Sequence, residues 1–200
     1  MKHLLASIFM LLTLAFLFSC SGSDAAVISY GSLYDSRDGQ TYKTVAIGSQ
    51  TWMAENLNYN ASGSARYNYG RLYNWSTALS ACPSGWHLPS DDEWQILVEY
   101  ADPDFVSHTN NVAGRKLKAT SGWNSGGSGT NDYGFSALPG GSNGSSDGIF
   151  INVGRYGLWW STTEDNASDA WFRGMYYDNE HVGRNNLDKS NLFSVRCLRD

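Results

Sequence analysis

The chain has 200 residues, a formal net charge of −5 and only 16% charged residues, and its lysines and arginines are scattered singly. A basic stripe is the usual electrostatic footprint of nucleic-acid binding, so nucleic acid is not expected as a partner. Eight tryptophans and twelve tyrosines argue against a disordered chain, and 21 glycines indicate a turn-rich domain rather than a helical bundle.

The first segment, residues 1–19, has the pattern of an export signal. Lys2 precedes an uncharged apolar run, Leu4–Phe18, which is shorter than the roughly 20 residues of a membrane-spanning helix. The run ends in Leu17-Phe18-Ser19-Cys20, which resembles a bacterial lipobox, where the cysteine is diacylated and becomes the mature N-terminus. We therefore predict a lipoprotein anchored through Cys20 in the outer membrane, on its surface or periplasmic face. The alternative is an ordinary secretory peptide followed by an unmodified cysteine.

A Ser/Gly tether over residues 20–32 and one domain over residues 33–200 are expected next. Thr41–Ile47 and Gln50–Ala54 are β-prone and flank a Gly-Ser turn, so they predict two strands. Leu72–Ala81 has apolar residues at helical spacing and predicts the first helix.

The second predicted helix begins after Ser90. Glu93 stands three residues beyond this N-cap, which is the pattern of a capping box, and the acidic residues between them favour the positive end of the helix dipole. Apolar residues repeat at helical spacing from Trp94 to Ala101, and Asp102-Pro103 predicts the end. The Ser-Asp-Asp-Glu sequence therefore has a structural explanation, and no catalytic role is needed.

Beyond residue 120, two loops rich in glycine and asparagine, 121–132 and 139–148, alternate with short β-prone segments. These segments are Tyr133–Leu138, Ile149–Val153, Leu158–Thr162, Ala170–Tyr177 and Leu192–Leu198. Because helices come first and strands follow, we expect an α+β fold of two helices, short mainly antiparallel strands and long irregular loops.

Two cysteines remain if Cys20 carries lipid, and an even pair in an exported protein is expected to be joined. A bridge between Cys82 and Cys197 would close a loop of roughly 115 residues, worth nearly 5 kcal/mol in the chain-entropy model. Two free buried thiols are the alternative.

Seven sequence blocks, in the same order, resemble the Fibrobacter succinogenes major paralogous domain, and together they cover residues 35–200. They are DGQTYKTV from Asp38, IGSQTWMAENLN from Ile47, LYNW from Leu72, CPSGWHLPSD from Cys82, YGFSALPGG from Tyr133, WWSTTE from Trp159 and SVRCLRD from Ser194. That family consists of bacterial surface and secreted proteins and resembles the C-type-lectin-like superfamily, including its formylglycine-generating-enzyme branch.

The resemblance implies a C-type-lectin-like fold, in which a long-range disulfide ties a helical region to the last strand, as Cys82 and Cys197 would. Formylglycine-generating chemistry needs a pair of active-site cysteines with a reactive thiolate. With Cys20 assigned to lipid and the other two to a bridge, that activity is not expected. His87, between Trp86 and Leu88, is expected to be a packed, hydrogen-bonded residue rather than a catalytic one.

The two glycine-rich loops are the candidates for a recognition surface, because the C-type-lectin-like fold carries its variable long loop there. Trp123, Asn124 and Asn143 are the candidate ligand-binding residues, since aromatic and amide side chains together suit a glycan or protein ligand. The alternative for Trp123 is that it packs inward under its loop. Three other tryptophans fall in β-prone segments and are expected in the core: Trp159, Trp160 and Trp171.

A calcium site is the one cofactor that the sequence suggests. Glu164, Asp165, Asn166 and Asp169 offer the hard oxygen ligands that calcium prefers, in a short loop between two β-prone segments. The Glu-Pro-Asn and Trp-Asn-Asp motifs of sugar-binding C-type lectins are absent from the sequence, and a solvated turn is the alternative.

These observations favour a non-enzymatic cell-surface binding or adhesion lipoprotein whose loops contact a glycan or a protein. A structural subunit of a surface complex is the first alternative, and an unrecognised hydrolase is the second. The resemblance does not decide among them, because one fold can carry many unrelated functions.

Overall fold

The computed structural model describes residues 27–143 and 149–200. The signal segment 1–19, the lipidation site Cys20 and most of the 20–32 tether lie outside these residues, as does part of the second glycine-rich loop. No helix within the two described ranges is long and apolar enough to cross a membrane.

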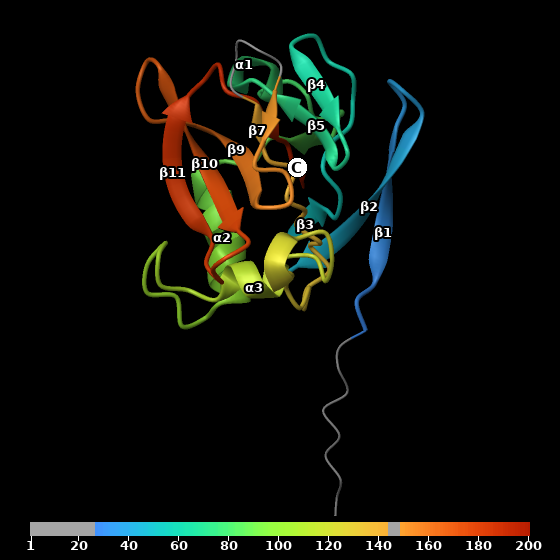
Figure 1. Cartoon of the computed structure of the whole chain (residues 1–200). Helices are drawn as coiled ribbons and strands as arrows, with labels where there is room; N and C mark the ends of the chain where they lie inside the picture. Colours follow the sequence, from blue (N-terminus) through green and yellow to red (C-terminus); the bar gives the residue numbers. More distant parts are fainter. Residues whose placement is uncertain (1–26, 144–148) are drawn as a thin grey trace, which may run out of the picture.

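The first sheet contains five strands. They are β1 (Tyr30–Asp35), β2 (Gln40–Ile47), β3 (Gln50–Met53), β6 (Trp86–His87) and β13 (Leu198–Arg199). Their order is β1-β2-β3-β13-β6, and every neighbouring pair is antiparallel. In Figure 1, β1 and β2 form a long twisted ribbon along one side of the molecule. The two strands expected before residue 55 are therefore present as β2 and β3.

The second sheet contains six strands. They are β4 (Ser64–Tyr67), β5 (Gly70–Tyr73), β9 (Tyr156–Glu164), β10 (Asp169–Tyr176), β11 (Gly183–Asp188) and β12 (Phe193–Ser194). Their order is β11-β10-β9-β12-β5-β4, and the pair β12–β9 is parallel whereas the others are antiparallel. A separate small pair joins β7 (Ser142–Asn143) to β8 (Phe150–Ile151).

The longest helix is α2 (Asp91–Ala101), which begins with the predicted capping box. Ser90 Oγ accepts a hydrogen bond from the Glu93 backbone N–H, and the Glu93 carboxylate accepts one from the Ser90 N–H. The other helices in the described ranges are α1 (Trp75–Ala78), α3 (Ala113–Leu117) and a 3₁₀ turn, η1 (Asn124–Gly126). The helix α2 lies behind β9 and β10 (Figure 1).

The expected α+β, C-type-lectin-like fold is wrong. The described residues contain thirteen strands and three α-helices, two of which have only four and five residues, so the fold is β-rich with curled antiparallel sheets. The segment Leu72–Ala81, which was expected to form one helix, shows one reason why the predicted fold class is wrong. Leu72 and Tyr73 pair with β12, and Asn74 then caps a helix that is complete by Ala78.

Three other segments differ from the prediction. The strand β11 was not predicted because its residues are mostly polar and exposed, so it lacks hydrophobic alternation and is held by backbone pairing with β10. Tyr133–Leu138 forms no strand, and Ala137 makes only one isolated bridge, to Lys118. The expected single strand Leu192–Leu198 divides into β12 and β13, which belong to different sheets.

The segment between β12 and β13 links the two sheets, and the expected disulfide is formed there. Cys82 and Cys197 are joined, with an S–S distance of 2.04 Å and a Cα–Cα distance of 5.9 Å. The adjacent backbone also pairs, because Met53 donates to the Cys197 carbonyl and Leu57 donates to the Val195 carbonyl. The bridge therefore fastens the chain before β6 to the point where both sheets meet.

The described residues form two hydrophobic clusters, one containing Trp94 and the other containing Trp160, and aromatic side chains are prominent in each. Trp94 lies 4.8 Å from Trp52 and 6.2 Å from Trp159, measured between ring centroids. Trp159 and Trp160 are fully buried, as expected from their β-prone segment. Trp171 is only half-buried, and the Arg184 guanidinium lies 3.4 Å from the centroid of its ring.

His87 is a hydrogen-bonded residue that links β6 to α2 and to the C-terminal residue. Its Nε2 lies 3.0 Å from Glu93 Oε1, and its Nδ1 lies 2.7 Å from Asp200 Oδ1. Partial burial disfavours the charged imidazole, but the hydrogen bonds to Asp200 and Glu93 outweigh it and raise the pKa of His87 above its usual value.

We expect His87 to make the stability of the protein depend on pH. A histidine whose pKa rises on folding stabilises fully below its unfolded pKa, and that stabilisation is lost as pH rises through the folded value. The effect should stay below about 1 kcal/mol because the ion pairs are solvent-exposed. The pKa values of His108 and His181 are lowered by burial, so they act in the opposite sense. His87→Gln isolates the contribution.

The measurement is the urea midpoint of the wild type and of His87→Gln at about pH 6 and about pH 8, on either side of the usual histidine pKa. The urea midpoint of the wild type should exceed that of His87→Gln by more at the lower pH than at the higher pH. An equal advantage at both pH values would show that His87 does not gain a proton on folding.

Candidate functional site

Trp123 packs inward, which is the alternative that the sequence left open. Its side chain is 6% exposed, and its indole N–H donates to the Ala137 carbonyl at 3.0 Å. The Lys118 ammonium lies 5.1 Å from the ring centroid, so Trp123 is enclosed by its own domain. Asn124 is exposed beside it, but Asn143 is 2% exposed in β7 and pairs through its backbone with Leu192. The structure therefore does not bring the three predicted ligand-binding side chains to one surface.

The predicted calcium loop forms the tip of the β9–β10 hairpin. Lys189, which follows β11, places its ammonium against this loop. Lys189 Nζ donates to Glu164 Oε1 at 3.0 Å, to the Asn166 carbonyl at 2.9 Å and to the Ala167 carbonyl at 3.0 Å. The Asn166 side chain also caps the turn, because its Oδ1 accepts the N–H groups of Ser168 and Asp169. No group of three or more Asp, Glu, His or Cys side chains suited to a metal occurs in the described ranges.

Calcium is therefore expected to leave the thermal stability of the protein unchanged. The ammonium of Lys189 already neutralises Glu164 and donates hydrogen bonds to the carbonyl oxygens of Asn166 and Ala167. A calcium ion would need these oxygens and would have to displace the ammonium. The measurement is the melting temperature of the wild type with millimolar calcium and with EDTA, and Lys189→Gln is the comparison variant. A calcium-dependent rise in the wild type would contradict the assignment of these oxygens to Lys189.

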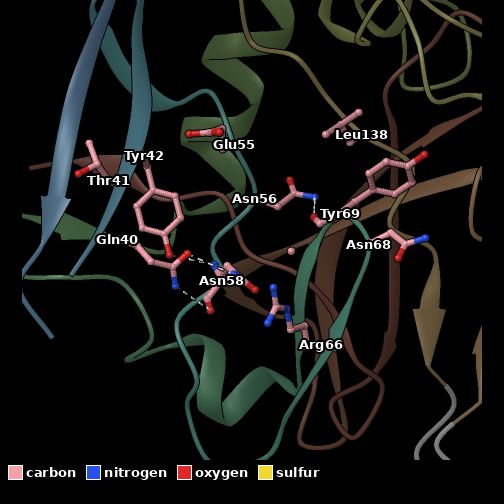
Figure 2. Close-up of a pocket in the computed structure, with 11 residues that line it drawn as sticks. Gln40, Thr41, Tyr42, Glu55, Asn56, Asn58, Arg66, Asn68, Tyr69 and Leu138 are labelled. Carbon is pink, nitrogen blue, oxygen red and sulfur yellow. Dashed lines mark hydrogen bonds between the residues drawn. The ribbon is translucent and has the colours of Figure 1, made fainter. Parts of the chain in front are cut away.

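A polar groove lies elsewhere, between the start of β2 and the β4–β5 hairpin, and has a volume of about 280 Å³ (Figure 2). We call it the amide groove. It is lined by Gln40, Thr41, Tyr42, Glu55, Asn56, Asn58, Arg66, Asn68, Tyr69, Gly70 and Leu138. Four of these residues carry amide side chains, and only one, Glu55, carries a carboxylate.

Asn56 fixes the floor of the groove. The residue is 5% exposed, and its Oδ1 accepts hydrogen bonds from Trp159 Nε1 at 2.9 Å and from Arg196 Nη2 at 2.8 Å. Its Nδ2 donates to the Tyr69 carbonyl at 2.9 Å, the bond drawn in Figure 2. Because both ends of the amide are engaged, the orientation of Asn56 and the position of the hairpin are set together.

Arg196 lies directly behind this floor and is completely buried. Its guanidinium donates to Asn56 Oδ1 and to the carbonyls of Met53, Phe135 and Ser136. Burial lowers the pKa of Arg196 to about 9, so the side chain still carries its charge at neutral pH. The network therefore joins the groove to the buried terminal segment.

The wall on the β2 side contains a hydrogen-bonded pair of amide side chains, Asn58 and Gln40. Asn58 Nδ2 donates to Gln40 Oε1 at 3.2 Å, and the Asn58 backbone N–H donates to the Tyr42 hydroxyl at 3.1 Å. Burial raises the pKa of Tyr42 to about 12, so the phenol stays protonated and keeps its own hydrogen as a donor. Figure 2 shows Gln40, Tyr42 and Asn58 converging on one side of the groove.

The opposite wall is the turn of the β4–β5 hairpin, Asn68-Tyr69. Gly70 follows it with a φ of +106°, and a Cβ there would lie 3.0 Å from Asn56 Cβ and 3.1 Å from the Leu57 carbonyl oxygen, so the position requires glycine. Tyr69 is half-buried, and its hydroxyl donates to the Gly122 carbonyl at 3.4 Å. The ring of Tyr69 is thus held at the rim, with the exposed Asn68 beside it.

The groove suits a ligand that is rich in hydroxyl groups. The exposed Asn68 amide offers both a donor and an acceptor, the Tyr42 hydroxyl offers a donor, and the Tyr69 ring and Leu138 provide a limited apolar surface. This site was not predicted from the sequence, although a signal existed. Three asparagines alternate with Leu57 and Tyr59 directly after a predicted strand, in the segment AENLNYN, and this density of amides is unusual for a simple connecting loop.

A family model, the Fibrobacter succinogenes major domain, matches residues 45–199. The matched region contains Asn56, Asn58, the whole β4–β5 hairpin and both bridged cysteines, whereas Gln40 and Tyr42 precede it. No curated protein matches the chain, and no solved structure matches it.

Proposed function

This chain belongs to the Fibrobacter succinogenes major domain family, and we propose that it is an exported, lipid-anchored, non-enzymatic module that binds a saccharide in the amide groove. The observation that carries the proposal is the set of amides whose orientations are fixed before any ligand arrives. Asn56 is held by Trp159, Arg196 and Tyr69, and Asn58 is held by Gln40. Side chains that are already ordered lose little entropy on binding, which favours affinity.

The chemistry of the groove supports a saccharide over an apolar ligand. Sugar hydroxyls both donate and accept hydrogen bonds, and so does the exposed Asn68 amide, while the Tyr42 hydroxyl keeps a hydrogen to donate. The half-buried ring of Tyr69 can contact the C–H face of a sugar while its hydroxyl remains bonded to Gly122. The oxygen-rich walls would leave an apolar ligand facing unpaired polar groups, which is unfavourable.

The lipid-anchored part of the proposal is supported by the sequence. The lipobox-like Leu17-Phe18-Ser19-Cys20 follows an apolar run of signal-peptide length. The disulfide between Cys82 and Cys197 agrees with an oxidising compartment. The same bridge supports a non-enzymatic role, because it removes both of those thiols from nucleophilic chemistry. We therefore place the module on the outer membrane, facing the surface or the periplasm.

The test is binding of the full-length protein to a panel of soluble polysaccharides, followed by Tyr69→Ala. Loss of the aromatic ring that Tyr69 presents at the rim is expected to weaken binding about tenfold. Tyr34→Ala is the matched control, because Tyr34 is 65% exposed on β1 and does not line the groove. Equal loss in both variants, or no loss in Tyr69→Ala, would refute the groove as the binding site.

The same experiment separates the competing functions. A structural subunit of a surface complex would instead co-purify with a stable protein partner and show no saccharide affinity. That alternative is favoured by β1, an edge strand of the first sheet that exposes Tyr30 and Tyr34. A hydrolase would release shortened saccharides, and its turnover would be lost when one carboxylate, such as Glu55, is changed.

A further inference from the structure

The amide groove continues past Asn58 into a second hollow of about 240 Å³, which we call the arginine end. It is lined by Asp38, Gln40, Asn58, Asn60, Arg66 and Arg71. Gln40, Asn58 and Arg66 line both hollows, so the two hollows adjoin. The arginine end differs from the rest of the groove because it places two cations together.

Arg66 and Arg71 are directly opposite each other across the β4–β5 hairpin. Directly opposed residues of an antiparallel pair project from the same face, and like charges in this position destabilise the hairpin. Arg71 Nη1 donates to the carbonyl and the hydroxyl of Ser64, at 3.3 Å and 3.1 Å. The exposed Arg66 has no side-chain partner among residues 27–143 and 149–200.

No carboxylate compensates the pair. Within the described part of the chain, no Asp or Glu oxygen lies within 4.0 Å of a nitrogen of Arg66 or Arg71. Asp38 lines the same hollow, but its oxygens accept the backbone N–H and Nε2 of Gln40, at 3.1 Å and 2.8 Å. Two opposed guanidinium groups and one carboxylate, Asp38, therefore line this hollow, and neither guanidinium is paired with that carboxylate.

Three other arginines of this chain are paired with carboxylates at short distance. Arg37 pairs with Asp35, and Arg173 and Arg184 share Asp91, with N–O distances between 2.6 and 2.8 Å. Where this chain places arginines close to one another elsewhere, as at Asp91, it supplies a carboxylate between them. At the arginine end no carboxylate of the described residues lies within 4.0 Å of either guanidinium, so both can accept an anion from outside the protein.

We propose that the arginine end binds an anionic substituent, a carboxylate or a sulfate, on the saccharide that occupies the amide groove. The inference rests on the proposed saccharide-binding function and specifies its ligand as an acidic polysaccharide. Each guanidinium presents several N–H donors in a plane, which matches the paired oxygens of a carboxylate or sulfate. The bound anion relieves the repulsion between Arg66 and Arg71, and the neutral part of the chain contacts the amides.

The test compares saccharides that differ only in charge, with the full-length protein titrated at low and at physiological ionic strength. Polygalacturonate and its methyl ester report on a carboxylate, and dextran sulfate and dextran report on a sulfate. The acidic member of one pair should bind at least about tenfold more tightly than its neutral counterpart, as expected for a charge-assisted hydrogen bond. Arg66→Gln and Arg71→Gln should each remove most of this preference. Arg71 lines only the arginine end, so Arg71→Gln should also leave binding of the neutral member unaffected.

Arg199→Gln is the matched control, because Arg199 is exposed on β13 and lies outside both hollows. Equal binding of both members of each pair, or a preference that persists in Arg66→Gln and Arg71→Gln, would overturn the anionic subsite and leave the saccharide function standing. Binding of neither member of either pair, in wild type and variants alike, would overturn both proposals.

A second measurement does not depend on the choice of saccharide. Sodium sulfate is compared with sodium chloride at equal ionic strength, and the melting temperature is recorded for the wild type and for the double variant Arg66→Gln/Arg71→Gln. Sulfate should raise the melting temperature of the wild type more than that of the double variant. An equal rise in both proteins would overturn the arginine end as an anion site.

Discussion

Replacing Cys82 by serine is expected to lower the free energy of unfolding by about 4–5 kcal/mol. The bridge joins residues 115 positions apart, so its loss gives the unfolded chain a large amount of conformational freedom. A domain of this size has a stability of only about 5–15 kcal/mol in total, so the variant should be near its limit at physiological temperature. The measurement is urea unfolding of wild type and variant.

The wild type treated with reductant provides the control, because it breaks the same bond without changing a residue. Reduction and Cys82→Ser should lower the urea midpoint by similar amounts. A shift worth less than about 1 kcal/mol in both cases would show that the rest of the domain fixes the two sheets without the bridge.

Replacing Arg196 by methionine is the second large effect that we expect, a loss of about 3–5 kcal/mol. Methionine fills a similar space but donates no hydrogen bond, so the carbonyls of Met53, Phe135 and Ser136 lose a donor inside the core. Removal of the desolvated charge offsets part of this cost, which keeps the expected loss in the range for a broken buried network. Urea unfolding measures the change.

Arg199→Met is the matched control, because this arginine lies three residues further along and is exposed. Its effect should stay within about 0.5 kcal/mol. Arg196→Met should also weaken saccharide binding, since Asn56 loses the donors that fix its orientation. Normal stability in Arg196→Met would contradict the role given to the buried network.

The elements that the sequence predicts correctly depend on neighbouring residues. The capping box at Ser90 needs only Glu93, three positions away, and the β2–β3 hairpin needs only a glycine turn between two β-prone segments. The Cys82–Cys197 disulfide follows from counting cysteines in a chain with a predicted export signal, and the family follows from sequence blocks that keep their order. None of these conclusions requires knowledge of distant contacts.

The errors depend on contacts that are remote in the chain. Leu72 and Tyr73 have helical spacing with later residues, yet they pair with β12, which lies some 120 positions further on. Trp123, for which the sequence left both orientations open, is a shorter-range case. Its indole N–H is bonded to Ala137, 14 positions away, and its ring is covered by Lys118. Local sequence could not show that these partners would be present.

The amide groove was missed for the same reason. Asn56 lies in a segment that the sequence marked only as a family block, and its role depends on Trp159 and Arg196, which are 103 and 140 positions away. The opposite wall comes from a two-residue hairpin turn, in a region where no strand was predicted. Amide density in the AENLNYN segment was visible in advance, but the surfaces that face it were not.

The most direct test of saccharide binding in the amide groove is a chemical-shift map of the isotope-labelled protein, recorded while a saccharide that binds is added. The side-chain amide signals of Asn58 and Asn68 should move and saturate together with the backbone signals of Tyr69 and Gly70. Shifts confined to residues 121–132 or to the Glu164–Asp169 hairpin tip, with the groove signals unchanged, would contradict it.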